Sequence, residues 1–477
     1  MKVILVRPPF YALFGVTTPK MKTYPLNLLY LATFVRERSH HTAGIVDGEN
    51  ITVPSLCQAG DEEHDPEMIM HRGIPRMIDI IENPDHEIWV AMERAILAEK
   101  PDLVGFSCNS GNMDAARILV RRMKARGVPV ILGGAHPTAL PEQSMTYTHS
   151  DMVAVGEGEL TLVRVMDSLE GKGSFSRIPS LVWKNEGRIR INPRGELITH
   201  IDELPIPDRS LVGRSDYFGE VLMTGRGCPF DCAYCASRTI WGKKVRLRSV
   251  SSIIEELHLL REAALASDSE SGCVPPHERP GRWVVKVVDD TFTVNKKRTL
   301  DLLERIAGSG LNCFEFTGGV RADTLDETVV QRMREANFRR VTLGVESGSP
   351  KILRMVRKGE TNEDVKRAIG LLTAVGIRSH AFFMIGFPGE DADDIALSKE
   401  LILDARPDYV EINMVTPYPG TDLFPRLIDE APSRIDRWYR WFHQGLATHS
   451  DRLGYDLDAA YEDFAGFARA YNRAADR

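Results

Sequence analysis

The sequence lacks any hydrophobic run that approaches the roughly 20 apolar residues of a membrane-spanning helix. Its first ten residues, MKVILVRPPF, hold only a short apolar core before Arg7-Pro8-Pro9. That core is too short for the hydrophobic region of a signal peptide. We therefore expect a β-strand at this end of the chain, no membrane span, and a cytoplasmic location.

An excess of basic residues is also missing. The 477 residues include 60 Lys and Arg against 67 Asp and Glu, which gives a formal net charge of −7, and no run of like charges dominates. Proteins that bind nucleic acids need positive charge to face the phosphates. We therefore expect no nucleic-acid partner. The length itself suggests two or three domains, each with its own core.

Cysteine is scarce, with seven residues in the whole chain, and this odd number argues against a disulfide scaffold. Three of the seven fall within eight positions of the segment TGRGCPFDCAYCAS at 224–237, namely Cys228, Cys232 and Cys235. The other four are isolated along the chain: Cys57, Cys108, Cys273 and Cys313. The sequence therefore predicts one metal site at the three clustered cysteines and no second metal cluster.

The first part of the chain alternates short apolar runs with amphipathic stretches. Apolar runs lie at 2–6, 44–47, 103–107, 128–134 and 152–156. Continuous apolar strands separated by helices indicate a parallel sheet covered on both faces. We therefore predict an α/β, Rossmann- or flavodoxin-like domain over residues 1–175. Its charged segment 57–88 is expected to be a surface excursion, and 176–215 are expected to form a hairpin and a proline-containing linker.

From residue 216 the alternation of strands and helices resumes with a longer period. Strands are predicted at 221–225, 284–289, 313–318, 340–345, 379–385 and 409–415. Six such units indicate a partial, TIM-like (β/α)6 barrel over 216–420, a fold that places its chemistry at the carboxyl ends of the strands. Residues 421–477 are expected to form a short helical cap. We expect the cap's aromatic residues to pack, although they could instead line a substrate pocket: Trp438, Tyr439, Trp441 and Phe442.

The cysteine motif, CxxxCxxC, follows the first predicted barrel strand and should therefore project into the barrel mouth. Structural zinc normally takes four Cys or His ligands, and the sequence near the motif offers no fourth. Three thiolates on a tight loop suit a [4Fe–4S] cluster with one iron left open to a ligand that is not protein. The motif therefore favours an iron–sulfur cluster over zinc or three unpaired thiols.

This motif, with Tyr234 before its last cysteine at the top of a partial barrel, resembles the radical S-adenosylmethionine (SAM) superfamily. The resemblance implies that Cys228, Cys232 and Cys235 are the catalytic cluster ligands and that SAM binds the open iron. One electron from the cluster then cleaves SAM to a 5′-deoxyadenosyl radical, which abstracts hydrogen from the substrate. It also implies an electron donor such as flavodoxin or ferredoxin.

Polar residues and glycines follow the later strands of the predicted barrel. They are Asp290 in VVDDTF, Gly318, Gly319 and Arg321 in TGGVRAD, and Glu346 in LGVESGS. A zwitterionic ligand with a ribose needs a cation for its carboxylate, acids for its ammonium and hydroxyls, and glycines where it approaches the backbone. By resemblance, Tyr234 lies against the adenine, Glu346 contacts the ribose, and Arg321 is a candidate contact for the carboxylate.

The sequence DDTF replaces the common GGE pattern after the second barrel strand, which resembles the superfamily members with an N-terminal cobalamin-binding domain. The strand ends of the first domain, SCNSGN, GGAHPT and GEGE, together with YPLNLLYLA at 24–32, are similar to that domain. The resemblance implies cobalamin contacts from Ser107, Asn109, Gly133, Gly134, His136, Gly156, Glu157, Gly158 and Glu159. Because the DxHxxG signature is missing, we expect no imidazole on the cobalt. His136 is expected to contact the nucleotide tail or the corrin side chains.

The resemblance as a whole implies methylation of an unactivated carbon of a small, natural-product-like organic substrate. One SAM would methylate cob(I)alamin, a second would give the radical, and the substrate radical would take its methyl group from methylcobalamin. An oxidative cyclisation or rearrangement, as in the anaerobic magnesium-protoporphyrin ester cyclases, stays open because the reacting atoms are on the substrate. A non-catalytic iron–sulfur or cobalamin-binding protein, and a first domain that binds nothing, are further alternatives.

Overall fold

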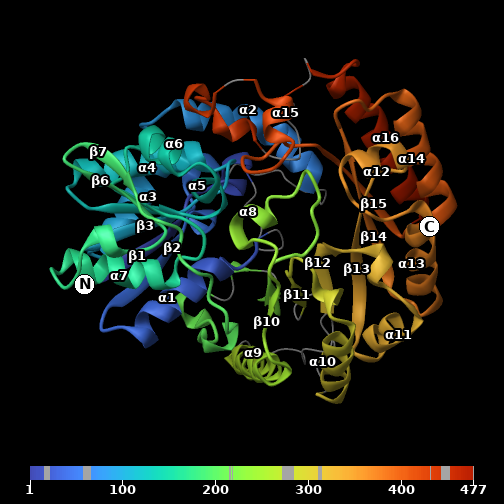
Figure 1. The fold of residues 1–477 in the computed structure, drawn as a ribbon, viewed down its shortest axis with the longest axis horizontal. Coiled ribbons are helices and arrows are strands. Elements are labelled where there is room, and N and C mark those ends of the chain that lie inside the picture. The colour runs from blue at the N-terminus through green and yellow to red at the C-terminus, as the bar shows by residue number, and fades with distance from the viewer. Residues whose placement is uncertain are drawn as a thin grey trace.

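The computed structural model describes residues 1–15, 22–56, 66–213, 216, 217, 219–270, 284–309, 314–429, 431–441, 449 and 452–475. It is an α/β protein with one large sheet in each of two lobes (Figure 1). A short helix, α8 (Ser237–Trp241), lies between the lobes in this view. The predicted fold class, a Rossmann- or flavodoxin-like domain followed by a partial barrel, is confirmed.

The first sheet has five parallel strands in the flavodoxin-like order 2-1-3-4-5. They are β2 (Thr42–Asp47), β1 (Lys2–Arg7), β3 (Leu103–Ser107), β4 (Val130–Gly133) and β5 (Met152–Ala154). One face packs against α1 (Leu26–Arg38) and α7 (Glu159–Leu169), and the other against α3 (Glu87–Ala98) and α4 (Met113–Ala125). Because both faces are buried, the strands are continuous apolar runs rather than alternating ones.

The predicted hairpin is present and extends this sheet. β6 (Leu181–Asn185) pairs antiparallel with β5, and β7 (Arg188–Ile191) pairs with β6. The first sheet therefore continues beyond residue 175, where the sequence pattern placed the end of the domain. The carboxyl side of the sheet also carries two short helices, α5 (Ala135–Ala139) and α6 (Pro141–Thr148).

The expectation that 57–88 is a surface excursion is wrong for its helical part. α2 (Pro66–Glu82) places Met77, Ile80 and Ile81 in the core, each at most 6% exposed. Their spacing of three and four residues makes one apolar stripe on a helix, and the charged residues between them concealed that stripe in the sequence. Residues 57–65 lie outside the described residues.

The second sheet has six parallel strands in the order 15-14-13-12-11-8 and does not close, as a partial barrel requires. The strands are β8 (Glu220–Leu222), β11 (Val285–Val287), β12 (Phe314–Val320), β13 (Phe338–Glu346), β14 (Arg378–Ile385) and β15 (Tyr409–Met414). The helices outside them are α9 (Val250–Glu270), α10 (Lys296–Gly308), α11 (Glu327–Glu335), α12 (Pro350–Met355), α13 (Asn362–Ala374) and α14 (Ala392–Ala405). All six predicted strands are present.

The C-terminal helix does not form a cap over the barrel. α16 (Leu457–Ala475) lies beside α14 in Figure 1 and shares the outer core of the barrel through Leu457 and Phe464. The Asn472 side chain accepts from the N–H of Val410 at 2.9 Å and donates to its carbonyl at 2.8 Å. α16 thereby pairs the backbone of one residue on the free edge of β15, an edge that an open sheet leaves unpaired.

The aromatic segment before α16 returns to the first lobe. Trp438 and Tyr439 are buried in the core that contains α2 and α4, and the Tyr439 N–H donates to the Asp114 carboxylate at 2.8 Å. The expectation that these aromatic residues pack is confirmed for Trp438, Tyr439 and Trp441. Phe442 lies outside the described residues. The segment is a strap that joins the two lobes, with α15 (Phe424–Leu427) at its start.

Two further expectations concern membranes and the isolated cysteines. Within the described ranges, no helix combines the length and the apolar character needed to cross a membrane. Cys108 is buried in the first lobe at 2% exposure, as expected for a small apolar residue. Cys57, Cys273 and Cys313 lie outside the described residues.

Candidate functional site

The three clustered cysteines lie on one loop between β9 (Gly225–Arg226) and α8, and all three are free thiols. β9 pairs with β10 (Arg246–Leu247), and the loop is anchored to the barrel by the Ala233 N–H, which donates to the Val356 carbonyl at 2.9 Å. The N–H groups of Phe230 and Ser237 point at the sulfurs of Cys228 and Cys235. Backbone donors of this kind stabilise cluster sulfur atoms.

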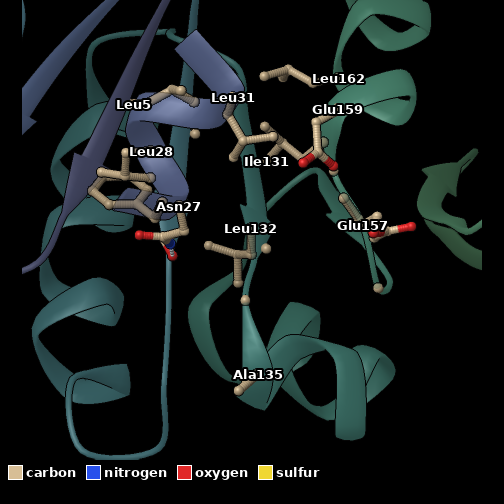
Figure 2. A pocket seen from close by; sticks show the side chains of 18 of the residues that line it. Leu5, Asn27, Leu28, Leu31, Ile131, Leu132, Ala135, Glu157, Glu159 and Leu162 are labelled. Carbon is tan, nitrogen blue, oxygen red and sulfur yellow. Dashed lines mark hydrogen bonds between the residues drawn. The ribbon is translucent and has the colours of Figure 1, made fainter. Parts of the chain in front are cut away.

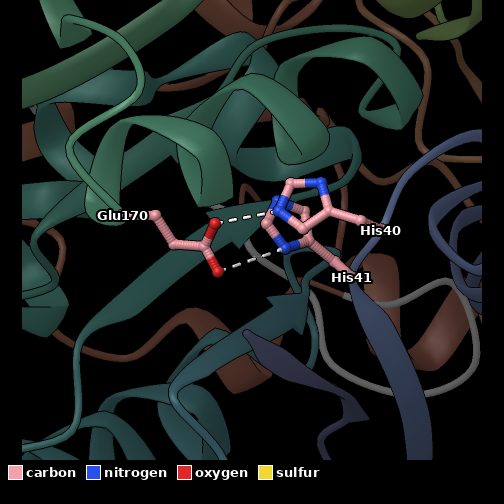
Figure 3. Close-up of side chains that lie close together, drawn as sticks. All are labelled: His40, His41 and Glu170. Atoms are coloured by element: carbon pink, nitrogen blue, oxygen red, sulfur yellow. Dashed lines mark hydrogen bonds and ion pairs between the residues drawn. The ribbon is translucent and has the colours of Figure 1, made fainter.

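The cysteine loop offers three thiols, whereas structural zinc normally takes four Cys or His ligands. Three thiols suit a [4Fe–4S] cluster with one iron left to another ligand. Elsewhere among the described residues, His40, His41 and Glu170 bring three ligand atoms within 4.8 Å of one another (Figure 3). Burial raises the pKa of Cys235 to about 11, so ligand binding must displace its proton.

The His40 group of Figure 3 is an ion-pair cluster on the far side of the first lobe. Glu170 accepts from the Lys172 ammonium at 2.6 Å and from the N-terminal ammonium at 3.0 Å. His40 Nε2 lies 2.8 Å from the same carboxylate. Because two cations already neutralise Glu170, we interpret this group as ion pairs that hold the N-terminus in place rather than as a metal site.

Two neighbouring acids at the end of β11 have different roles. Asp289 is buried and accepts from the Thr224 N–H at 2.6 Å and from the Thr224 hydroxyl, which ties β11 to the segment before the cysteine loop. Asp290 is exposed in the barrel mouth, and its carboxylate accepts from the Gly227 N–H at 3.1 Å. Asp290, the predicted site residue, is therefore the one that lies at the cysteine loop.

Glu346 is held in a strained conformation at the end of β13. Its φ of +70° is left-handed, and the pairing of β13 with β14 shifts register between Gly344 and Glu346. Such a conformation costs a side-chain-bearing residue about 1–3 kcal/mol and tends to occur at functional sites. The carboxylate accepts from the Tyr234 hydroxyl at 2.9 Å, so the structure brings these two predicted residues together.

Two charged residues that sequence reasoning missed complete this group. The Lys358 ammonium lies 3.1 Å from Glu346, 3.3 Å from the Tyr234 hydroxyl and 3.6 Å from Glu360. Lys358 and Glu360 are 6% and 5% exposed. They follow a helix rather than a strand, so the search at strand ends passed over them. The available signal was the charged segment RKGE at 357–360, in the short connection between two helices.

The Glu360 carboxylate is buried, and its hydrogen-bonding capacity is not satisfied by the described residues. Neither of its oxygens accepts a hydrogen bond from the part of the chain that the structure describes. Burial raises its pKa to about 7, although Lys358 and Arg321 oppose that rise. A buried acceptor with no donor indicates a ligand whose ammonium or hydroxyl groups it would meet.

Arg321 and the two predicted glycines lie next to this group, at the end of β12. The Arg321 guanidinium makes a two-bond pair with Asp323, donates to the Lys358 carbonyl at 2.7 Å and lies 3.8 Å from the centre of the Phe230 ring. Its role as a carboxylate contact stays a prediction, because these partners occupy much of the guanidinium. Gly318 and Gly319 sit where the pairing of β12 with β13 shifts register, and Gly319 has φ +82°.

A pocket of about 230 Å³ opens at the junction of the two lobes, over the carboxyl side of the first sheet (Figure 2). Its apolar wall comes from β1, α1, β4 and α7, namely Leu5, Leu28, Leu31, Ile131, Leu132 and Leu162. Asn27 and Ser107 supply polar groups, and Asn27 Nδ2 donates to the Ser107 hydroxyl at 2.6 Å. Pockets for whole drug-sized ligands span about 300–1,000 Å³, so this one suits one small, mainly apolar group of a larger ligand.

Seven of the nine residues predicted to bind cobalamin line this pocket: Ser107, Gly133, Gly134, Gly156, Glu157, Gly158 and Glu159. Gly134 shows why glycine is needed there. Its φ is +104°, and a Cβ would come within 2.4 Å of the Cys108 carbonyl oxygen. The Gly-Gly turn therefore lets β4 end directly against the neighbouring strand loop and leaves the pocket open.

The other two predicted residues lie elsewhere. Asn109 forms a turn with Asn112, each side-chain oxygen accepting from the other's N–H at 3.1 and 2.9 Å. His136 is 2% exposed, lies 2.9 Å from the Ser110 hydroxyl and packs its ring 4.3 Å from that of Trp438. The ring packs on the strap, and its expected contact with the nucleotide tail or the corrin stays a prediction.

A buried ion-pair network closes the pocket on the barrel side. Arg226 donates to Glu157 and Glu159 at 2.7 Å each, and Arg246 donates to Glu157 at 2.8 Å. Arg226 also lies over the rings of Tyr30 and Trp241, at 5.4 and 5.2 Å. Glu157 and Glu159 thus bind arginine across the lobe junction, which the sequence pattern did not show.

Comparison with known proteins bears on both lobes. A sequence model of the radical SAM superfamily matches residues 222–402, and one of the B12 binding domain matches residues 13–166. An uncharacterised methyltransferase of Pyrococcus horikoshii is 32% identical over 439 residues, which span 89% of this chain and 82% of that protein. The cytidylyl-2-hydroxyethylphosphonate methyltransferase of Streptomyces wedmorensis is 25% identical over 100% of this chain and 91% of its own length.

Two further similarities are more distant. The anaerobic magnesium-protoporphyrin IX monomethyl ester cyclase of Rubrivivax gelatinosus is 26% identical over 69% of this chain and 59% of that protein. The radical SAM methyltransferase TsrM of Kitasatospora setae, solved with cobalamin and a [4Fe–4S] cluster, superimposes with a TM-score of 0.67 at 17% identity. That match covers 90% of this chain and 78% of TsrM, and it concerns the fold.

Proposed function

Because this chain belongs to the cobalamin-dependent radical SAM enzymes, with a B12-binding domain before a radical SAM barrel, we propose that it methylates an unactivated carbon of a small organic substrate. The enzymes of this family use a [4Fe–4S] cluster, SAM and cobalamin. The observation that carries the proposal is the shared wall of the two sites. The cysteine loop ends in α8, and Ile240 and Trp241 of α8 line the pocket of the first lobe.

In this proposal Cys228, Cys232 and Cys235 hold the cluster, and the group around Glu346 holds SAM. When bound, the cluster and cobalamin supply one-electron cleavage of SAM and a transferable methyl group. The buried Lys358 ammonium supplies the cation for the SAM carboxylate, and Glu346 and Glu360 accept from its hydroxyl or ammonium groups. Arg321 positions this group, because it stacks on Phe230 of the cysteine loop and lies 3.5 Å from Glu360.

The first lobe is proposed to hold cobalamin through the apolar pocket of Figure 2. The leucine side chains of α1 and the end of β4 would hold the base of the nucleotide tail. Ser107 and Asn27 would supply hydrogen bonds to its polar part, and Gly133 and Gly134 would let it approach the backbone. The mainly apolar lining, with few polar groups, is the chemistry that such a base requires.

The products of SAM test this proposal before any substrate is known. The anaerobically prepared protein is mixed with SAM and a strong reductant, with and without bound cobalamin, and both SAM products are quantified. We expect 5′-deoxyadenosine in both samples. S-adenosylhomocysteine should form only in the cobalamin-loaded sample, up to about one equivalent of the bound cobalt. Equal S-adenosylhomocysteine without cobalamin would contradict the proposal.

Oxidative cyclisation is the second candidate, because the cyclases are among the relatives. Such an enzyme would form 5′-deoxyadenosine but no S-adenosylhomocysteine in the same assay, so one experiment separates the two reactions. For either reaction, a one-electron reductant such as flavodoxin or ferredoxin is the proposed partner. A cytoplasmic location is proposed because the free thiols of the cluster loop require a reducing compartment.

A further inference from the structure

We propose that Arg226 and Trp241 are positioning residues that couple the pocket of the first lobe to the cysteine loop, so that the nucleotide tail of cobalamin stabilises the cluster. This inference rests on the proposed function. Its direct observation is that the cysteine loop is flanked on both sides by residues of the pocket wall. Arg226 lies two residues before Cys228, and Ile240 and Trp241 follow Cys235 on the next helix.

The N-terminal flank is held by charge. The side chains of Arg226, Glu157 and Glu159 are each at most 6% exposed, so their ion pairs are shielded from water. Buried pairs of this kind are costly to break, because removing one partner leaves an uncompensated charge. Arg226 is therefore fixed by the first lobe although it belongs to the barrel.

The C-terminal flank is held by α8. Arg194, in the linker after β7, donates to the carbonyls of Thr239 and Ile240 at 2.9 and 3.0 Å. The Thr239 hydroxyl donates to the Gly420 carbonyl of the barrel at 2.6 Å. Trp241 then lies against the Arg226 guanidinium at 5.2 Å, which joins the two flanks to each other. The cysteine loop, which connects the two flanks, is therefore held at both ends by residues of the pocket wall.

A ligand in the pocket would pack against that wall and hold both flanks. The cluster and cobalamin are then linked, and each must raise the affinity for the other by the same factor. Couplings between sites are typically 5–150-fold. The base of the tail, rather than the larger corrin ring, is the part that reaches the wall, because the pocket of about 230 Å³ has room for one small group. Cobinamide, which has the ring without the nucleotide, is therefore the discriminating probe.

The test measures the release of cluster iron to a chelator in the full chain, prepared anaerobically with its cluster. Three samples are compared: no corrinoid, hydroxocobalamin and cobinamide, with bound cobalt measured in each. We expect cobalamin to slow iron release at least about fivefold and cobinamide to slow it less. In Trp241→Ala and Arg226→Lys, cobalamin should no longer slow the release of iron, even when these variants bind as much cobalt as wild type. Trp183→Ala, a partly buried tryptophan of β6 outside the pocket, is the matched control and should keep the protection by cobalamin.

A second readout follows from reciprocity. Cys232→Ala, which cannot hold the cluster, should bind cobalamin more weakly than the wild-type protein with its cluster, measured by the cobalamin absorption spectrum. Bound cobalamin that leaves iron release unchanged, or Trp241→Ala that keeps full protection, would overturn the coupling while the proposed function stands. A protein that holds iron but takes up no cobalt would instead overturn the proposed function, and the coupling with it.

Discussion

Replacement of Lys358 by methionine removes the cation from a buried group that also contains Glu346 and Glu360. The ammonium lies 3.1 and 3.6 Å from the two carboxylates. At an effective dielectric constant of about 20, each attraction is worth roughly 5 kcal/mol before the cost of desolvation. When desolvation is included, removal of one partner of a buried ion pair lowers the free energy of unfolding by about 3–5 kcal/mol. We therefore expect Lys358→Met to destabilise the barrel by at least about 3 kcal/mol at pH 8.

The loss should depend on pH through Glu360. Its pKa in the folded protein, about 7, lies above its ordinary value of 4.5, so the ionised carboxylate lowers stability. The Glu360 carboxyl contributes fully to the free energy of unfolding below about pH 4.5, and this contribution is lost as the pH rises through 7. Lys358 lowers this pKa, so its removal raises the pKa further. The variant should therefore be closer to wild type at pH 6 than at pH 8.

Hydrogen exchange of the β13 and β14 amides measures this local stability. At pH 8, exchange in Lys358→Met should be at least about 100-fold faster than in wild type, since 1.4 kcal/mol corresponds to a factor of ten. The control is Lys351→Met, which removes an exposed lysine from Asp391 and Asp394 and should cost less than about 1 kcal/mol. Equal effects of the two variants, or a larger loss at pH 6 than at pH 8, would refute the reasoning.

Three other changes have defined outcomes. Cys235→Ala should remove the cluster iron while hydrogen exchange in β1–β5 stays unchanged, because the loop contributes no residue to that core. Iron retained at the wild-type amount would count against the cluster. Gly133→Leu should lower cobalamin affinity at least about tenfold without loss of iron, since Gly133 lines the pocket and a Cβ there would meet no atom closer than 4.0 Å. Unchanged affinity would place cobalamin elsewhere. Asp114→Asn should accelerate exchange of the Tyr439 amide by about a factor of ten, because a charged acceptor becomes a neutral one; an unchanged rate would mean that the strap is held by packing alone.

Much of the fold was predictable because its signals are local. The apolar strands of both sheets are continuous runs, and each of the six barrel strands lies within a few residues of its predicted place. The cysteine motif needed only spacing, since three thiols in eight positions already define one loop. Glu346 was predictable because strand ends of parallel sheets gather polar residues at one edge.

What could not be predicted depends on contacts between distant segments. Glu157 and Glu159 were expected at the cobalamin site and do line the pocket, yet their arginine partners lie more than 65 residues away. His136 was placed on its sequence motif, but the Trp438 ring that holds it comes from the opposite end of the chain. Lys358 was missed because it follows a helix, and only the fold brings it to Glu346.

The central claim is that one chain holds both an iron–sulfur cluster and cobalamin at adjoining sites. The most direct measurement is the amount of iron, sulfide and cobalt per chain after anaerobic purification with hydroxocobalamin, in wild type and in Cys232→Ala. The account predicts about four irons and one cobalt in wild type, and cobalt without iron in the variant. Iron without cobalt in wild type, or zinc in place of iron, would contradict it.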